Sequence, residues 1–152
     1  MTITRATPAH AATVGRLLHD FNVEFDSPTP TAEEFAARFT RLLEWEDQLV
    51  LLAGDPADPE GFAYLTTRSS PYYDGPLMQL EELYVRPRLR DRGIGTELVL
   101  GMLRRARERH CGEIHVNVDE VDVDTRRFYE RHGFTNTEPG EDSRMLLYLR
   151  EL

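Results

Sequence analysis

The chain has no lysine, since all 18 of its basic residues are arginine. This absence excludes a Schiff-base lysine and the lysine of a phosphate-binding P-loop. The single cysteine, Cys111, excludes an internal disulfide, and its place at the end of a predicted helix favours packing over catalysis. The longest hydrophobic run, Leu49–Ala53, is far shorter than the ~20 residues that a membrane-spanning helix needs.

The net charge and the spacing of the histidines exclude further classes of function. The net charge is −9, which disfavours general nucleic-acid binding because phosphate recognition needs a basic face. The five histidines show no metal-ligand spacing, so we expect no metal site. The first ten residues lack the apolar core of a signal peptide, which favours a cytoplasmic protein. A length of 152 residues favours one domain over residues 1–152.

The hydrophobic pattern predicts an α/β (α+β) protein with helices on both faces of a mixed sheet. Helical spacing of apolar residues alternates along the chain with strand-like runs, and the Thr31/Glu34 pair predicts a capping box. In order, we expect a strand at 2–6, helices at 8–25 and 31–43, strands at 48–55, 60–68 and 77–85, a helix at 93–108, a strand at 113–120, a helix at 124–132 and a strand at 143–152.

Residues 90–98, RDRGIGTEL, follow a predicted strand and open a predicted helix. Glycines allow backbone amides to approach a ligand, and a helix N-terminus adds the positive end of its dipole, so this loop suits a pyrophosphate. Arg88, Arg90 and Arg92 offer guanidinium donors for further phosphates. The alternative is a glycine-bearing turn with solvated arginines. A Rossmann fingerprint is excluded because Leu98 stands where its third glycine is required.

Two separated motifs resemble those of the GNAT acetyltransferase superfamily. The first is Leu83-Tyr84-Val85, then Pro87, then RDRGIG at 90–95, which matches [QR]-x-x-G-x-[GA]. The second is FYERHGF at 128–134, and the order of elements fits the family along the whole chain. The resemblance implies a mostly antiparallel twisted sheet of six to seven strands, with a V-shaped splay between the fourth and fifth strands.

The resemblance also implies an acetyl-CoA site, in which pantetheine pairs with the backbone of residues 83–85 and residues 91–96 cradle the pyrophosphate. No metal is implied. Asp122 stands where the family has Asn and Thr125 where it has Ala, which leaves contacts from residues 122–125 open. The acidic segment could equally be a loop in which Asp124 caps the following helix. The implied cofactor contacts are Leu83, Tyr84, Val85, Arg90, Asp91, Arg92, Gly93, Ile94, Gly95, Thr96, Asp122 and Thr125.

Glu81 and Glu82 are the candidate bases, because attack on a thioester needs a neutral amine and most amines are protonated at pH 7. Two adjacent carboxylates raise at least one pKa, and burial adds to this effect. In a regular strand only one of the two can face the site. Resemblance to diamine acetyltransferases favours Glu81. The strand is bulged in this family, so the alternation of side chains along a regular strand is an unsafe guide to which glutamate faces the site. The alternative for Glu82 is a salt bridge to an arginine.

Tyr129 is the candidate general acid, since a tyrosine pKa near ~10 suits protonation of a departing thiolate. Its alternative is a core aromatic residue beside Phe128. Tyr72, Tyr73 and Asp74 lie in the loop before the key strand, where an aromatic and acidic cluster suits a cationic amine. The alternative there is a pair of ordinary surface tyrosines.

The motifs together predict transfer of an acetyl group from acetyl-CoA to a primary amine. The expected acceptor is a small molecule such as a polyamine, an amino acid or an amino-bearing antibiotic. A protein or peptide N-acetyltransferase and a non-catalytic acyl-CoA-binding regulator on the same fold stay open as alternatives. The resemblance implies that a homodimer is common, and neither nucleic acid nor membrane is an expected partner.

Overall fold

The computed structural model describes all residues, 1–152, as two compact units. The first unit is Met1–Val116 and the second is Asn117–Leu152. The single domain expected over residues 1–152 stays a prediction. No helix in either unit combines the length and the apolar character that a membrane crossing requires.

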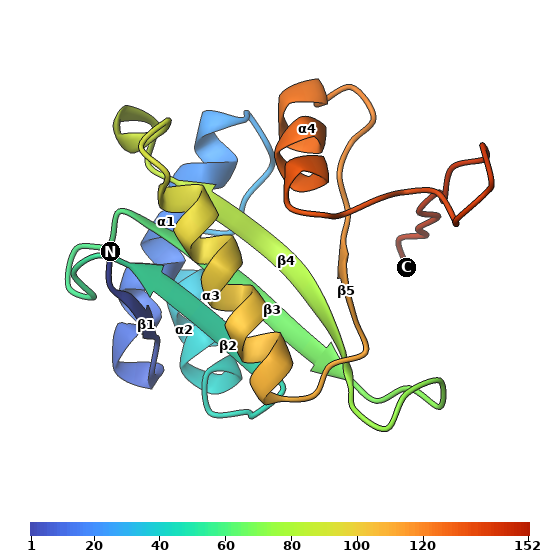
Figure 1. The fold of residues 1–152 in the computed structure, drawn as a ribbon. Coiled ribbons are helices and arrows are strands. Elements are labelled where there is room, and N and C mark those ends of the chain that lie inside the picture. Colours follow the sequence, from blue (N-terminus) through green and yellow to red (C-terminus); the bar gives the residue numbers. More distant parts are fainter. The chain divides into compact units, whose positions relative to one another are not determined.

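The first unit is built on a five-stranded sheet whose spatial order follows the chain, β1-β2-β3-β4-β5. Neighbouring strands are antiparallel except for β4 and β5, which are parallel (Figure 1). The expected mixed and mostly antiparallel sheet is therefore confirmed. The strands are β1 Ile3–Arg5, β2 Gln48–Ala53, β3 Gly61–Arg68, β4 Leu77–Val85 and β5 Glu113–Val116.

Helices cover both faces of this sheet, as the sequence predicts. Helix α3 (Ile94–Glu108) crosses one face, and helices α1 (Ala11–Glu24) and α2 (Ala32–Leu42) lie on the other (Figure 1). The segment Leu49–Ala53 of β2 is almost fully buried. A strand covered on both faces needs apolar side chains on both, which explains this continuous hydrophobic run.

Aromatic rings fill the core beneath α1 and α2. Phe21 on α1 meets the ring of Tyr84 edge-on at a centroid distance of 5.1 Å, and Phe39 on α2 meets Tyr64 in the same way at 5.4 Å. Edge-to-face pairs of this kind add to the stabilisation that burial provides. They hold two tyrosines of β3 and β4 in fixed positions on the face that α1 and α2 cover.

The helix starts follow local capping. Glu34 N–H donates to Thr31 Oγ1 (3.1 Å), and Thr31 N–H donates to Glu34 Oε2 (2.8 Å), which is the predicted capping box of α2. Both hydrogen bonds lower the pKa of Glu34. Helix α1 begins later than expected, at Ala11, because Pro8–His10 form a separate 3-10 turn.

The strand expected at 143–152 is wrong. Residues 145–152 have no regular secondary structure, and one isolated antiparallel bridge joins Thr137 to Arg144. A strand forms only where a neighbour supplies the ladder of hydrogen bonds, and this segment has none beyond Arg144. Strand β5 also ends earlier than expected, at Val116, so the sheet has five strands rather than six to seven. The exposed apolar side chains of this terminus are Met145, Leu146, Leu147, Tyr148, Leu149 and Leu152.

The second unit contains helix α4 (Val123–Arg131). Its N-cap is Asp122, whose Oδ1 accepts a hydrogen bond from the N–H of Thr125 (3.2 Å). The alternative cap at Asp124 is wrong, because a capping residue precedes the helix and Asp124 already lies in the first turn. Gly133 lies just beyond the helix with φ +88°, a conformation that favours glycine.

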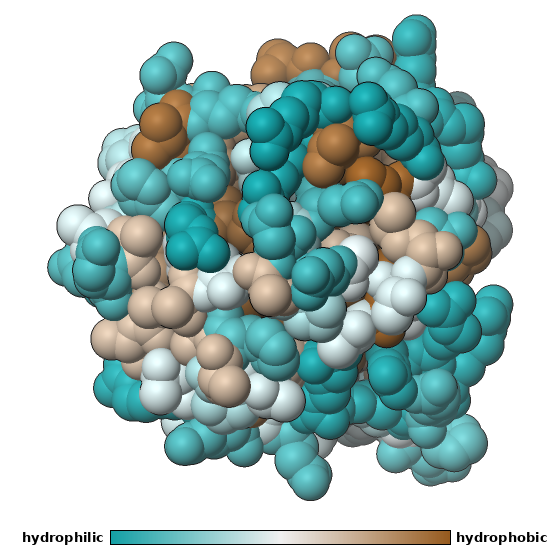
Figure 2. Space-filling view, turned by 90° about the vertical axis from the view of Figure 1, so that its left-hand side faces the viewer, coloured by the Kyte–Doolittle hydropathy of each residue, from teal (hydrophilic) through white to brown (hydrophobic).

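One face of the molecule is predominantly polar. Hydrophilic side chains dominate the face shown in Figure 2, where hydrophobic patches are small and separate. No polar or charged residue is fully buried, and no buried side-chain nitrogen or oxygen lacks a hydrogen-bond partner. The charged groups that matter for function are therefore within reach of solvent and ligands.

Gly15 lies where α1 crosses α2. A Cβ added at this residue would stand 2.7 Å from the backbone nitrogen of Ala36 and 2.9 Å from the carbonyl oxygen of Ala32. Such distances are shorter than non-bonded contacts allow, so the close approach of the two helices requires glycine.

We therefore expect Gly15→Ala to destabilise the protein by about 1–3 kcal/mol, because the added methyl forces the helices apart. This loss would appear despite the higher helix propensity of alanine. The midpoint of urea unfolding measures it. Ala12→Gln, at an exposed position of the same helix, should change the free energy of unfolding by no more than about 0.5 kcal/mol. An unchanged midpoint for Gly15→Ala would mean that the crossing has room for a side chain.

Candidate active site

Strand β4 carries one more residue than β3 at the position of the two glutamates. Tyr64 pairs with Glu82, and the next residue of β3, Leu65, pairs with Leu80. Glu81 therefore has no partner on β3 and forms a β-bulge. The bulge that the resemblance implied for this strand is present, and it lies between the two candidate bases.

The bulge brings both glutamates to one face of the sheet. Directly paired residues point to the same side, so Glu82 shares the face of Tyr64. Thr66 lies two residues from Tyr64 on β3 and shares that face too. The Thr66 hydroxyl donates a hydrogen bond to Glu81 Oε1 (2.6 Å), which draws Glu81 to the same side. A regular strand would place only one of the two glutamates on this face, and the extra residue interrupts that alternation.

Glu82 is the more enclosed of the two carboxylates, since it is half-buried whereas Glu81 is exposed. Burial raises the pKa of Glu82 above the usual glutamate value, and the nearby charge of Glu81 raises it further. Neither carboxylate forms an ion pair, so the salt bridge considered for Glu82 is not present. A carboxylate with a raised pKa and no counter-ion is suited to accept a proton near neutral pH.

Tyr64 stands directly across from Glu82 and completes this cluster. Its hydroxyl donates a short hydrogen bond to Gln48 Oε1. Burial raises the pKa of Tyr64 to about 12, and the charges of Glu81, Asp47 and Glu82 contribute to this rise. The phenol therefore stays neutral at physiological pH and provides one wall of the acidic cluster.

Sequence patterns alone contain no sign of this role for Tyr64, Gln48 or Thr66. The register of β2, β3 and β4 brings Tyr64 and Thr66 beside the glutamates and Gln48 beside Tyr64. Polar residues in otherwise apolar strands are the one signal that could have drawn attention to them.

The ladder between β4 and β5 ends next to the glutamates. The last paired residues are Leu80 and Val116, and β4 continues to Val85 without a partner in β5. Backbone groups at 81–85 are therefore free of a β5 strand partner on that edge. This is the V-shaped splay expected between the fourth and fifth strands, and it leaves a strand edge to which an extended ligand can add.

The loop between β4 and α3 ends in an uncapped helix N-terminus. Gly93 is the N-cap residue of α3, with φ +82° and no side-chain capping hydrogen bond. Asp91 also has a positive φ, +60°, which bends the loop sharply. Because no side chain satisfies the first amides of α3, those N–H groups are available to an anion.

Arg90 has a structural role in this loop. Its Nη2 lies 2.7 Å from a carboxylate oxygen of Glu24 on α1, and its Nε donates to the carbonyl oxygen of Val85 (3.0 Å). Its guanidinium also lies 5.8 Å from the ring centroid of Tyr84. Arg88 and Arg92 are exposed and form no ion pair, so both are free to meet a phosphate, and Arg92 is the one next to the N-terminus of α3.

The loop containing Tyr72, Tyr73 and Asp74 is attached to the start of β5. The Tyr73 hydroxyl donates to Glu113 Oε1 (2.6 Å), and a Cβ at Gly112 would lie 2.2 Å from the Tyr73 ring. Hydrogen bonds from Tyr73 and then His115 lower the pKa of Glu113. This loop precedes Leu77, at the opposite end of β4 from the Arg/Gly loop, the stretch RDRGIG at 90–95. A substrate contact there stays a prediction.

The remaining predicted residues belong to the second unit. Asp122 and the backbone of Thr125 are engaged in the cap of α4. Tyr129 is 7% exposed, and its ring meets those of Phe128 and Phe134 edge-on. Its role as an acid stays a prediction.

The first unit thus combines a splayed mixed sheet with an uncapped helix N-terminus. Residues 16–134 match the model of the acetyltransferase (GNAT) family, and the chain belongs to that family. The resemblance seen in the two motifs is thereby confirmed. A curated relative of Oryza sativa subsp. japonica, named "Probable glucosamine 6-phosphate N-acetyltransferase 2", is 30% identical over 113 residues. That match covers 70% of this chain and 66% of the rice protein, just under two thirds of its length.

Solved structures agree with this assignment. A crystal structure from Arthrobacter sp. FB24, provisionally described as an acetyltransferase, is 49% identical, with a TM-score of 0.93 over 100% of this chain and 96% of that one. The aminoglycoside acetyltransferase meta-AAC0020 from an uncultured soil sample, in complex with trehalose, has a TM-score of 0.79 at 21% identity over 99% and 95% of the chains. AAC(6')-Iy with a CoA-containing bisubstrate analogue has a TM-score of 0.77 at 19% identity over 99% and 98%. These last two likenesses concern the fold alone.

The raised pKa of Glu82 makes a prediction about stability. The native state binds this proton more tightly than the unfolded chain, so stability falls as the pH rises through the raised native pKa. Glu82→Gln removes the charge and keeps the size. We expect its melting temperature to exceed that of the parent protein at pH 8, with the difference shrinking toward pH 4. Calorimetry measures both, and Glu44→Gln, at an exposed carboxylate, is the matched control. A lower melting temperature for Glu82→Gln at pH 8 would contradict the assignment.

Proposed function

We propose that the protein transfers an acetyl group from acetyl-CoA to a primary amine of a small molecule. The observation that carries this proposal is the pair of glutamates on one face of β4, at the point where β4 loses its pairing with β5. The amine needs a proton acceptor, and the extended thioester needs a free strand edge along which to bind. The two features lie side by side at this point of β4. Membership of the acetyltransferase (GNAT) family supports the reaction class.

Glu82 is the base in this proposal. It is half-buried, its pKa is raised by burial and by Glu81, and it has no counter-ion. Glu81 is exposed and already accepts a hydrogen bond from Thr66. The preference for Glu81 came from resemblance to diamine acetyltransferases, whereas the environment favours its neighbour. Glu81 then acts by raising the pKa of Glu82 and by attracting a cationic acceptor.

Acetyl-CoA binds as co-substrate along the free edge of β4 in this proposal. The backbone of Leu83–Val85 pairs with pantetheine, and the first amides of α3 receive the pyrophosphate. Gly93 and Gly95 keep that approach free of side chains, and Arg92 adds a cation. Arg90 contributes indirectly, since it holds the loop to α1 through Glu24.

The proposed reaction is a direct attack. The neutral amine nitrogen bonds to the thioester carbonyl carbon, and a backbone N–H near Leu83 stabilises the developing oxyanion. Glu82 accepts the proton that the amine loses. The carbon–sulfur bond breaks, and the thiolate takes a proton from Tyr129, which gives free CoA and the N-acetylated product.

The acceptor is proposed to be a cationic small molecule. Asp47, Glu81 and Glu82 place their charges around Tyr64, which attracts an ammonium compound before deprotonation. The names of similar proteins, a glucosamine 6-phosphate N-acetyltransferase and aminoglycoside acetyltransferases, favour amino sugars among the amines considered. Nothing observed favours the non-catalytic alternative.

The direct test is thiol release from acetyl-CoA with a panel of amino sugars, polyamines and amino acids. With the best acceptor, kcat/KM of the parent should rise with pH until Glu82 is ionised. Glu82→Gln should lower kcat/KM by about 10²–10⁴-fold and remove that rise, because the proton acceptor is lost.

Two further variants keep this test specific. Glu81→Gln should retain the rise but shift it to lower pH, because a like charge next to Glu82 has been removed. Tyr129→Phe keeps the ring packing against Phe128 and Phe134 and should slow turnover if the hydroxyl is the acid. Loss of the pH-dependent rise in Glu81→Gln rather than Glu82→Gln would transfer the role of base to Glu81. No thiol release with any amine would contradict the proposed reaction.

We also propose a homodimer, with a cytoplasmic location as expected from the sequence. The support is the C-terminal segment, where Leu146, Leu147 and Leu149 are 70%, 61% and 78% exposed. A second copy carries the same apolar segment, and two such segments can pair about a two-fold axis. Light scattering should give the mass of a dimer, and Leu147→Asp should give a folded monomer whose melting temperature no longer depends on protein concentration. Val121→Asp, at another exposed position of this unit, should remain dimeric. A monomeric parent protein would contradict the proposal.

A further inference from the structure

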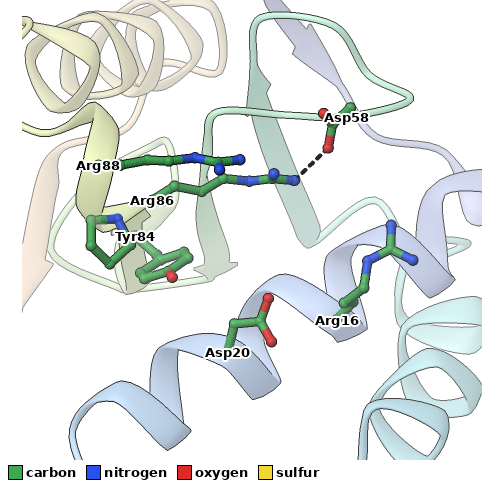
Figure 3. Close-up of a pocket in the computed structure, with 7 residues that line it drawn as sticks. Arg16, Asp20, Asp58, Tyr84, Arg86 and Arg88 are labelled. Carbon is green, nitrogen blue, oxygen red and sulfur yellow. Dashed lines mark hydrogen bonds and ion pairs between the residues drawn. The ribbon is translucent and has the colours of Figure 1, made fainter.

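A pocket lies beyond Glu82, at the end of β4. It is a pocket of about 520 Å³ within the first unit. Three elements and a loop form its walls (Figure 3). The lining residues are Arg16 and Asp20 from α1, Asp58 from the β2–β3 loop, Tyr84 from β4, and Arg86, Pro87 and Arg88 from the stretch that follows β4.

Two of the three arginines in this pocket lack a counter-ion. Arg86 Nη2 lies 2.6 Å from Asp58 Oδ1, whereas Arg16 and Arg88 form no ion pair. Arg86 and Arg88 run side by side along one wall, and Arg16 stands on α1 across the pocket (Figure 3). Like charges gathered in a concavity repel one another unless an anion binds between them. This local excess of positive charge occurs in a chain whose net charge is −9.

The Tyr84 hydroxyl adds a hydrogen-bond donor to the same pocket. Tyr84 is only 4% exposed, its ring is packed against Phe21 and Phe62, and its hydroxyl faces the pocket (Figure 3). The structure contains no hydrogen bond from this hydroxyl to any protein group. Burial raises the pKa of Tyr84, and the charges of Glu24 and Asp20 raise it further, so the group is protonated and able to donate. No buried side-chain oxygen in the structure lacks a partner, so this unpartnered hydroxyl is open to the pocket and available to donate to a ligand.

Asp20 adds an acceptor to the same pocket. Its one contact within ion-pair distance is His19 Nδ1 at 3.8 Å, so most of its hydrogen-bonding capacity is unused. A carboxylate oxygen in this position repels an anion but accepts a hydrogen bond from a hydroxyl or an ammonium. The pocket therefore combines donors for an anion with an acceptor for a neighbouring polar hydrogen.

We propose that this pocket binds the phosphate group of a hydroxylated phosphate ester. Arg16 and Arg88 bind the phosphate oxygens, the Tyr84 hydroxyl donates to one of them, and Asp20 accepts from a hydroxyl of the same ligand. A phosphate fits better than a carboxylate, because its three free oxygens and nearly two charges match two unpaired guanidinium groups and a phenol. The volume falls in the range of ordinary small-molecule pockets, about 300–1,000 Å³.

The pocket is distinct from the proposed pyrophosphate site. The amides of that site belong to the first turn of α3, which begins at Ile94. Arg90 lies between the two in sequence, and its guanidinium is held by Glu24 and Val85. Two kinds of ligand fit this chemistry. One is an amine acceptor that carries a phosphate, and the other is a phosphate ester that is never acetylated. Binding without turnover tests the pocket independently of the proposed reaction.

The experiment is calorimetric titration of the CoA-saturated protein with glucose 6-phosphate, and with inorganic phosphate as the minimal probe. We expect one glucose 6-phosphate per chain, bound more tightly than inorganic phosphate because Asp20 accepts from a sugar hydroxyl. Arg16→Gln and Arg88→Gln should each weaken binding by about tenfold or more, since each removes a charge-assisted hydrogen bond. Tyr84→Phe keeps the ring and should weaken it by a smaller factor. Arg107→Gln, at an exposed arginine of α3, should leave it unchanged.

Several results would overturn the proposal. One is the absence of binding at about 10 mM of either probe, and another is binding that Arg16→Gln and Arg88→Gln leave intact. If protein saturated with dephospho-CoA binds glucose 6-phosphate and CoA-saturated protein does not, the pocket holds the coenzyme's own phosphate and is not a separate site. Titration with glucosamine 6-phosphate distinguishes a phosphorylated acceptor from a phosphate ester that is not acetylated. If the thiol assay consumes glucosamine 6-phosphate, and Arg88→Gln raises its KM, the ligand of the pocket is an acceptor. If glucosamine 6-phosphate binds but is not consumed, the pocket takes a separate ligand. Both results support the pocket.

Discussion

The single extra residue in β4 is the constraint on which the candidate site depends. Without it, Glu81 and Glu82 would point to opposite faces of the sheet, and one of them would enter the core beneath α3. The bulge instead leaves Leu80 paired with Leu65 and places both carboxylates on the face of Tyr64. Burial and mutual repulsion then follow from position alone, and they raise the pKa of Glu82.

The same region explains where the sheet opens. Pairing between β4 and β5 ends at Leu80, the residue immediately before the bulge. A bulge increases local twist and bends its strand, so it offers a physical reason for the two parallel strands to separate there. The proton acceptor and the free strand edge thus arise at one position, which is why a thioester and an amine can be brought together there in the proposed reaction.

Arginines organise the far end of β4. Arg90 uses both ends of its guanidinium to join α1, the last residue of β4 and the loop before α3. Arg86 and Arg88 instead face the pocket beside Tyr84. Along one strand and its continuation, the charge therefore changes from acidic at Glu82 to basic beyond Tyr84. An all-arginine set of cations suits these contacts, since several rest on the planar fork that lysine lacks.

Much of this fold follows from local sequence, and the differences have identifiable causes. The Thr31 capping box and the Arg/Gly loop are encoded by adjacent residues, so both were predictable. The C-terminal strand was not, because a strand depends on a partner that its own residues do not specify. Contacts such as Tyr64 with Gln48 depend on register between strands. The bulge was expected only through resemblance, since no pattern within LEEL indicates which residue is the extra one.

The central claim is that the bulge at Glu81 gives Glu82 a raised pKa on the face where the amine arrives. Carbon-13 NMR of the glutamate carboxyl carbons, followed as the pH is raised, measures that pKa directly. The account predicts that Glu82 titrates above the ordinary glutamate value of about 4.3 and moves back toward it in Glu81→Gln. A Glu82 carboxyl that titrates at or below the ordinary value, or that does not respond to Glu81→Gln, would contradict it.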